Sequence, residues 1–171
     1  GPHFNTIAAL GVSLKEAASP AFKDYSRRTV DNARALAAAL VSRGYHVSSG
    51  GTDNHLLLVD VRKSRGLPGK RAAVALEEVN IELNFNTVPN ASESQKPLFP
   101  DGIRMGTPCL TTRGMKEADM AAVAEFIDRA LKLVKTGKLA EGESMWTDAA
   151  AKDKLAAEIA AFASKFPMFA Y

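Results

Sequence analysis

The segment between Ser19 and Gly44 constrains the fold most, because its pattern predicts one long helix. Ser19-Pro20 supplies a capping residue followed by a proline at the first helical position. Apolar residues then recur along one helical face, and Gly44 is a typical terminator just beyond the last turn. We therefore expect a helix from Pro20 to Arg43 that keeps one apolar face.

The remaining sequence alternates strand patterns with helical patterns. Short β-forming runs between turn residues indicate strands, and apolar residues at helical spacing indicate helices. In chain order we expect helices at 6–17 and 20–43, strands at 45–47 and 55–61, a helix at 69–79, strands at 81–83 and 102–105, and helices at 120–134 and 149–166. This order predicts an α+β fold with a small, mainly antiparallel sheet that helices cover on one face.

The segment from Asn84 to Asp101 is too rich in breaking residues for regular structure, since it holds Pro89, Pro97 and Pro100. We expect a loop here. Loops of this length in a compact domain are often functional.

Asn84 and Asn86 stand two residues apart at the start of this segment. In an extended chain both side chains would point the same way and present amide donors and acceptors, which suits the edge of a heterocycle. The alternative is that they are turn-forming residues that close the preceding strand.

Arg104 interrupts an otherwise apolar strand between two glycines that permit close approach of a backbone or a ligand. If the guanidinium points inward it needs an anion, and its planar fork suits a carboxylate. The alternative is that Arg104 faces solvent or pairs with an aspartate or glutamate.

The composition excludes several classes of function. Apolar residues make up 46% of the chain, which is enough for one globular domain with its own core. The net charge is +3 and the two signs are interspersed, so no nucleic-acid partner is predicted. No apolar run approaches the ~20 residues of a membrane span, so no membrane partner is predicted. The common phosphate-loop, nucleophile-elbow and zinc-protease motifs are absent.

Cys109 is the only cysteine, which excludes an internal disulfide, and we expect it to be a buried small hydrophobic residue. His3, His46 and His55 do not stand at metal-ligand spacing, so no metal site is predicted. The turn at 50–53 is expected to close a hairpin, although backbone donors in such a turn can also bind phosphate.

Five ordered blocks of the chain resemble serine hydroxymethyltransferase. They are GPHFNTIAAL at 1–10, SGGTDNHLLLVDVR at 49–62, NFNTVPN at 84–90, GIRMGTPCLTTRGM at 102–115 and FASKFPM at 162–168. Together they extend over essentially the whole chain in the family's order, which is far more specific than any single motif.

The resemblance implies a fold-type I pyridoxal-phosphate enzyme. Residues 1–44 would supply the end of its large domain and the long connecting helix, and residues 45–171 the small C-terminal domain. The family reaction transfers the hydroxymethyl carbon of serine to tetrahydrofolate and yields glycine and 5,10-methylenetetrahydrofolate. Family members form homodimers or homotetramers, and they are cytoplasmic or mitochondrial.

The resemblance also implies roles for individual residues. Arg104 matches the family arginine that holds the substrate carboxylate, and Asn86 matches the asparagine that hydrogen-bonds the pteridine ring of folate. Gly1 falls on a glycine whose backbone approaches the cofactor phosphate of the neighbouring subunit. The family lysine that anchors the cofactor has no counterpart here, so the resemblance implies no catalytic residue in this chain and no activity for the chain alone. Asn5 departs from the family pattern, which has a histidine there.

Two other interpretations stay open. A noncatalytic assembly or ligand-binding module of the same fold would not need the lysine that anchors the cofactor. Another fold-type I enzyme, such as an aminotransferase, would share the arginine but not the folate asparagine. A His-Lys segment upstream in the gene would favour an enzyme over the module, and folate binding by the whole protein would distinguish the two enzymes.

Overall fold

A computed structural model of the chain describes residues 1–89 and 100–168. The part of the sequence with Pro97 and the last three residues of the tail lie outside the described residues. In chain order the elements are α1 (Phe4–Ala17), α2 (Pro20–Ser42), β1 (His46–Val47), a 3-10 turn (Ser48–Gly50), β2 (Leu56–Asp60), α3 (Val61–Arg65), α4 (Gly69–Glu77), β3 (Asn84–Asn86), β4 (Gly102–Gly106), α5 (Pro108–Thr112), a second 3-10 turn (Glu117–Asp119), α6 (Met120–Lys132) and α7 (Ala149–Ala163).

Helix α2 forms as its sequence predicts. The Ser19 side chain accepts a hydrogen bond from the Phe22 amide at 3.2 Å, which caps the first turn. At the other end Gly44 adopts φ +83°, a left-handed conformation that suits glycine. The buried residues of α2 lie between Thr29 and Leu40, and none lies in the first two turns. The helix therefore joins the core through its later turns.

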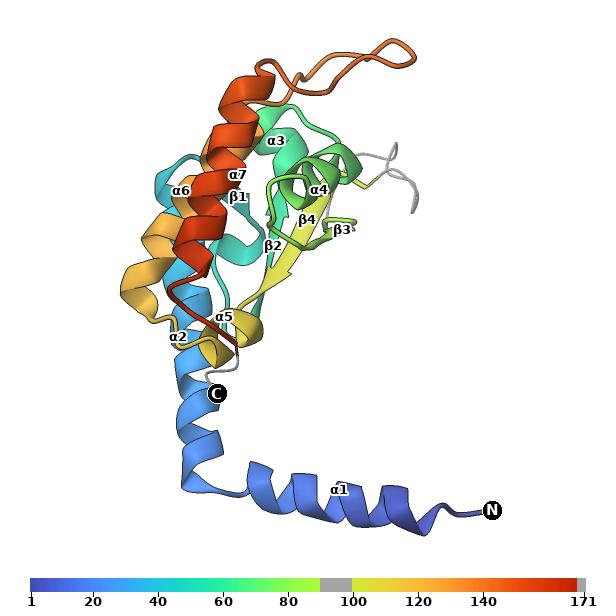
Figure 1. Cartoon of the computed structure of the whole chain (residues 1–171), viewed down its shortest axis with the longest axis vertical. Helices are drawn as coiled ribbons and strands as arrows, with labels where there is room; N and C mark the ends of the chain where they lie inside the picture. Colours follow the sequence, from blue (N-terminus) through green and yellow to red (C-terminus); the bar gives the residue numbers. More distant parts are fainter. Residues whose placement is uncertain (90–99, 169–171) are drawn as a thin grey trace.

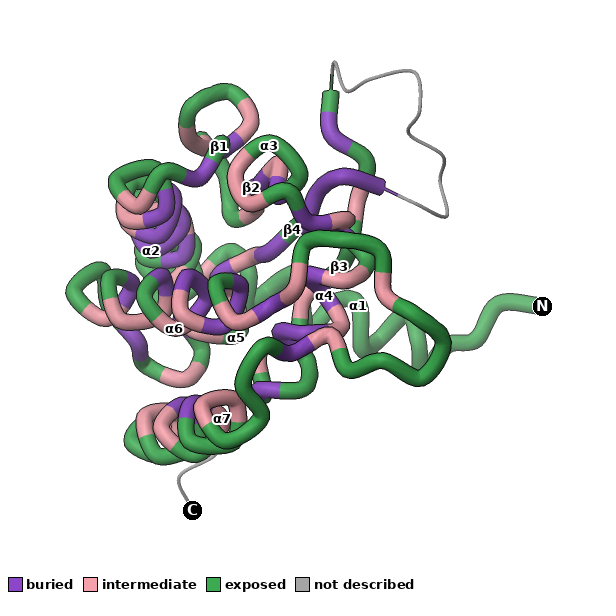
Figure 2. Tube along the Cα trace, turned by 90° about the horizontal axis from the view of Figure 1, so that it is seen from above, coloured by how far each residue is buried: buried purple, intermediate pink, exposed green. Residues whose placement is uncertain are grey.

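Helix α1 extends from the start of α2, away from the rest of the molecule (Figure 1). None of its residues is buried, and Figure 2 shows the whole helix as exposed. Large apolar side chains nevertheless stand on it, among them Phe4, which is 78% exposed, and Leu14, which is 61% exposed. An apolar helix with so little cover indicates a surface that contacts other protein.

The four strands form one antiparallel sheet in the order β1-β2-β4-β3. One face of the sheet carries Leu57, Val59, Ile103 and Met105, all of which are buried. Helices α2 and α4 contact the sheet, and α6 packs against both helices. The prediction of an α+β fold with a small antiparallel sheet is confirmed. The boundary after residue 44 stays a prediction.

The predicted strand at 81–83 is wrong, because the chain becomes a strand three residues later, at Asn84–Asn86. The residues that pair with β3 lie in β4, so its position depends on a contact distant in sequence. The loop predicted from Asn84 onward therefore begins after Asn86. The short helices α3 and α5 were not expected, since five residues are too few to show a helical period.

A buried carboxylate joins α6 to α3 and to the residue before β1. The Asp128 carboxylate accepts hydrogen bonds from the Tyr45 hydroxyl at 3.2 Å and from Arg65 Nη2 at 2.8 Å. Lys132 Nζ lies 2.7 Å from its second oxygen. Burial alone would raise the pKa of Asp128, but the hydrogen bonds from Lys132 and Arg65 outweigh it and hold the pKa below its usual value. Burial raises the pKa of Tyr45.

No helix in the described part of the chain combines the length and apolar character needed to span a bilayer.

Candidate functional site

The face of the sheet opposite the core carries Arg104, and we call it the open face. Arg104 is exposed, whereas its neighbours Ile103 and Met105 are buried on the other side of the strand. The guanidinium has no ion pair or hydrogen bond with any described residue. The Arg104 side chain therefore faces away from the core, and no acidic residue within residues 1–89 and 100–168 pairs with it. That it holds a carboxylate stays a prediction.

Strand β4 is held at both ends, and this fixes the position of Arg104. At its start, the Arg62 side chain pairs with the Asp101 carboxylate at 2.9 Å. At its end, the Thr107 hydroxyl donates to the Thr29 carbonyl of α2 at 2.6 Å. Arg104 therefore projects from a strand that is anchored to α2 and to the start of α3.

Asn84 lies directly opposite Arg104 in the sheet, and Asn86 lies opposite Gly102. Residues two apart in a strand share a face, so both asparagine side chains are on the open face with Arg104. The prediction that the two amides point the same way is confirmed. Asn84 is exposed, while Asn86 is partly buried and its amide donates to the Thr87 carbonyl at 2.9 Å. The alternative that they form a turn is wrong, because both belong to β3.

The open face contains a hollow of about 590 Å³ next to Arg104. The connection between β1 and β2 forms one wall, and Pro89 lies at the border. Asp53 is the acidic residue among its described lining residues, and it lies 3.4 Å from Arg34. Among the described residues of the lining, no carboxylate pairs with the Arg104 guanidinium, which favours an anionic ligand.

The wall from Ser48 to Asn54 has a fixed shape. Ser49 and Gly50 adopt positive φ angles of 64° and 73°, which turn the chain back toward β2. The Asn54 side chain then accepts a hydrogen bond from the Leu56 amide at 2.7 Å, and the Thr52 hydroxyl donates to the Leu56 carbonyl. Strands β1 and β2 pair in antiparallel fashion, so the predicted hairpin is confirmed. Sequence reasoning did not foresee that this connection borders Arg104.

Gly1 is not part of this group. It is exposed at the free end of α1, far from the sheet (Figure 1), and a side chain added there would meet nothing within 4 Å. The structure thus brings Arg104 and Asn86 to one face and leaves Gly1 apart from them.

Cys109 is exposed, so its assignment as a buried residue is wrong. It stands in the first turn of α5, and the side chain lies at a cavity on the helix-covered side of the sheet. Among the described residues, no three histidine, cysteine, aspartate or glutamate side chains are grouped so as to hold a metal ion.

Comparison with known proteins identifies the family. A family model described as serine hydroxymethyltransferase matches residues 1–127, which include all the elements of the open face. The chain belongs to the serine hydroxymethyltransferase family. Helix α7 lies beyond the matched residues.

Curated relatives extend this match. A serine hydroxymethyltransferase of Acidothermus cellulolyticus is 46% identical over 167 residues, which are 98% of this chain and 37% of the relative. A mitochondrial serine hydroxymethyltransferase of Candida glabrata is 48% identical over 78% of this chain and 27% of its own length. A cytosolic one of Neurospora crassa is 43% identical over 98% of this chain and 36% of its own length. The chain spans roughly a third of the length of these relatives.

Proposed function

We propose that the whole protein is a pyridoxal-phosphate enzyme that transfers the hydroxymethyl group of serine to tetrahydrofolate and releases glycine. In this proposal the chain contributes the small domain with its connecting helix, and its role is to bind and orient the two substrates. Membership of the serine hydroxymethyltransferase family supports the proposal, as do the names of the relatives, two of which are mitochondrial and cytosolic enzymes. Either compartment is consistent with it.

The observation that carries the proposal is the unpaired guanidinium of Arg104 on the open face. A guanidinium offers five N–H donors in a planar fork, and a carboxylate accepts two of them at once. Arg104 projects from an anchored strand beside a hollow whose acidic residue, Asp53, has its own arginine. The serine carboxylate would bind here, and the fork would fix the orientation of the substrate Cα bonds.

Asn86 would bind the second substrate. Its amide both donates and accepts, as the edge of a pteridine ring requires. Asn86 shares the open face with Arg104, and one N–H of its side-chain amide already donates to the Thr87 carbonyl. That contact limits rotation of the side chain, so the orientation of the amide is partly set before a ligand binds.

The start of α1 suits the cofactor phosphate. The first turn of α1 has no acidic residue, and its leading N–H groups have no side-chain cap from His3. Such a helix start favours a phosphate, so the main chain at Gly1 and the residues after it would hold the cofactor phosphate of a neighbouring subunit. When bound, pyridoxal phosphate supplies an electron sink for cleavage at the substrate α-carbon. The anchoring lysine would come from outside this chain.

Association with other protein follows from the same end of the molecule. The exposed apolar side chains of α1 would be covered by the rest of the polypeptide and by a second subunit, in a fold-type I homodimer or homotetramer. This arrangement would also bring Gly1 to a site that its own Arg104 does not share.

The direct test is turnover by the full-length protein with pyridoxal phosphate added. We expect glycine to form from serine at a rate that depends on tetrahydrofolate. A full-length protein that binds the cofactor but forms no glycine under these conditions would contradict the proposal.

A further inference from the structure

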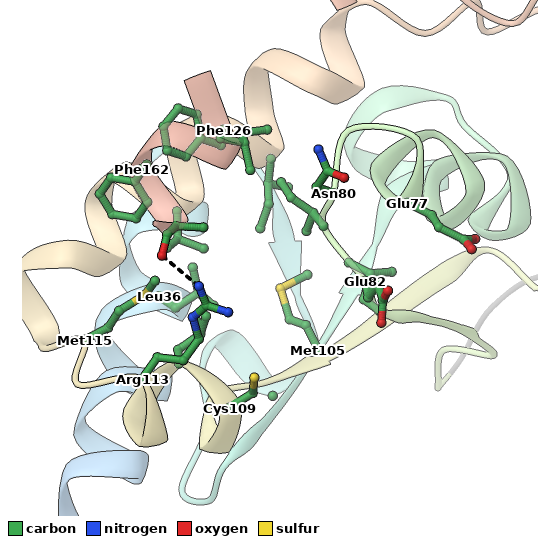
Figure 3. A pocket seen from close by; sticks show the side chains of 18 residues that line it. Leu36, Glu77, Asn80, Glu82, Met105, Cys109, Arg113, Met115, Phe126 and Phe162 are labelled. Atoms are coloured by element: carbon green, nitrogen blue, oxygen red, sulfur yellow. Dashed lines mark hydrogen bonds between the residues drawn. The ribbon is translucent and has the colours of Figure 1, made fainter. Parts of the chain in front are cut away.

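A second cavity, of about 460 Å³, lies on the helix-covered side of the sheet. Figure 3 shows it between β4, the end of α5, and helices α6 and α7. Apolar side chains such as Leu36, Met105, Met115, Phe126 and Phe162 supply most of its lining. Met105 follows Arg104 in the strand and points to the other side, so this cavity is separate from the hollow on the open face.

Arg113 brings a positive charge into this apolar surrounding. Its Nη2 donates to the Ala163 carbonyl at the end of α7, at 2.7 Å. Its Nε is buried and has no hydrogen-bond partner. Figure 3 shows the guanidinium reaching from the end of α5 into the cavity. Nε is shielded and Nη2 is engaged, so the charge of the guanidinium has no counter-charge among the described residues, and a carboxylate in the cavity would supply one.

The acidic residues of the lining are not that acceptor. Glu77 and Glu82 are exposed and lie on the other side of the lining from Arg113 (Figure 3). Among the described residues, neither forms an ion pair with Arg113. The end of the cavity at Arg113 is therefore cationic, its walls are apolar, and the side with Glu77 and Glu82 carries two negative charges.

We propose that this cavity binds a small monocarboxylate with an apolar body, such as an arylalkanoate. The carboxylate accepts hydrogen bonds from the Nη1 end of the Arg113 guanidinium, and the apolar body packs between Met105, Met115 and the phenyl rings. The volume lies in the range of small-molecule pockets, about 300 to 1,000 Å³. Glu77 and Glu82 disfavour a second carboxylate on their side of the cavity, so monocarboxylates bind better than dicarboxylates. This site is independent of the proposed transferase function.

Methyl NMR of the chain labelled at its methionine methyl groups tests the proposal with 3-phenylpropanoate as the probe. We expect saturable shifts of Met105 and Met115, which line the cavity, and none of Met168, which is exposed outside it. The neutral analogue 3-phenylpropanamide should bind at least about tenfold more weakly, because it cannot form a charge-assisted pair with Arg113. Equal binding of acid and amide, or no saturable shift, would overturn the proposal.

A variant identifies the residue responsible. Arg113→Gln keeps a donor for the Ala163 carbonyl but loses the charge, so it should bind acid and amide equally. The matched control is Arg71→Gln, because Arg71 also donates to backbone carbonyls, those of Lys135 and Gly137, outside the cavity. The control should keep the preference for the acid. Loss of the preference in the control, or its retention in Arg113→Gln, would contradict the assignment.

Cys109 gives a readout that needs no variant, which matters if Arg113→Gln fails to fold. The thiol is exposed and lines the same cavity, and the chain has one cysteine. In the unsubstituted chain, saturating 3-phenylpropanoate should slow alkylation of Cys109 by iodoacetamide several-fold, while the amide at the same concentration should not. Alkylation at the same rate with both compounds would reject a bound carboxylate at this place.

Discussion

Arg104 of β4 and Asn84 of β3 are direct partners across the antiparallel pair, and both project to the open face. The register of this pair also places Asn86 on that face, two residues further along β3. The proposed carboxylate and folate contacts thus depend on one register. A slip by a single residue would turn both asparagines to the other face.

Asn86→Ala in the full-length protein should weaken tetrahydrofolate by roughly 1 to 3 kcal/mol, because the ring edge loses a partner in a partly dry site. Serine binding should stay nearly unchanged, since Arg104 makes the proposed contact with serine. Asn84→Ala, on the same strand and face, is the matched control and should affect folate much less. Separate titrations of folate and serine measure both effects. If Asn86→Ala weakened the binding of folate and of serine equally, Asn86 would have a structural role and no specific contact with folate.

The isolated chain should not retain pyridoxal phosphate, because the proposed function places the lysine that anchors the cofactor outside this chain. Dialysis after incubation with the cofactor, followed by mass spectrometry after borohydride reduction, measures any retained adduct. We expect none in stoichiometric amount. A single lysine of this chain that carries the cofactor at full occupancy would disprove the prediction.

Asp128→Asn should lower the free energy of unfolding by about 3 kcal/mol, because Arg65 and Lys132 would lose a buried counter-charge. The matched control is Glu158→Gln, which breaks the exposed pair with Arg129 and should change stability little. Urea unfolding of the chain at neutral pH gives both values. Equal effects of the two substitutions would show that the buried carboxylate has no special role.

The same carboxylate predicts how stability depends on pH. The folded-state pKa of Asp128 is held below its usual value near 3.8, so the folded state binds this proton less readily than the unfolded state. The carboxylate therefore contributes fully to the free energy of unfolding above about pH 4. This contribution is lost as the pH falls through the folded-state pKa of Asp128. In Asp128→Asn the stability should fall less steeply below pH 4. The same fall in stability below pH 4 in Asp128→Asn and in the unsubstituted chain would contradict this prediction.

Gly69→Ala should destabilise the chain by about 2 kcal/mol or more, because a side chain there would clash with the backbone before and within β4. The added carbon would lie 2.8 Å from the Pro100 carbonyl and 2.9 Å from the Gly102 amide. Gly137→Ala is the control, since an added carbon there meets nothing within 4 Å. Thermal unfolding of both variants tests the close approach of α4 to β4. Similar melting temperatures would contradict it.

Local signals predicted the long elements correctly. Ser19 and Asp148 cap α2 and α7 through the bonds expected of them, to Phe22 and Ala151. Strand β3 was misplaced because Ile81 and Leu83 have the stronger β-forming character, yet the pairing with β4 selects Asn84–Asn86. Such pairing joins distant residues and leaves no mark in the local pattern.

The candidate site was predictable only in part. The strand pattern and the spacing singled out Arg104 and Asn86, the resemblance suggested their roles, and alternation along the strands explains why they share a face. The wall formed by the β1–β2 connection was not foreseen, since its place beside Arg104 depends on the fold. Cys109 was judged by the usual burial of cysteine, whereas the five-residue helix α5 carries it to the surface.

The central claim, that Arg104 binds the serine carboxylate, is tested most directly by kcat/KM for serine in full-length Arg104→Lys. Lysine keeps the charge but loses the bidentate fork, so kcat/KM should fall by on the order of 30-fold, equivalent to about 2 kcal/mol, with the melting temperature unchanged. Arg28→Lys, at an exposed arginine paired with Asp24, should leave kcat/KM unchanged. An unchanged kcat/KM in Arg104→Lys would contradict the account.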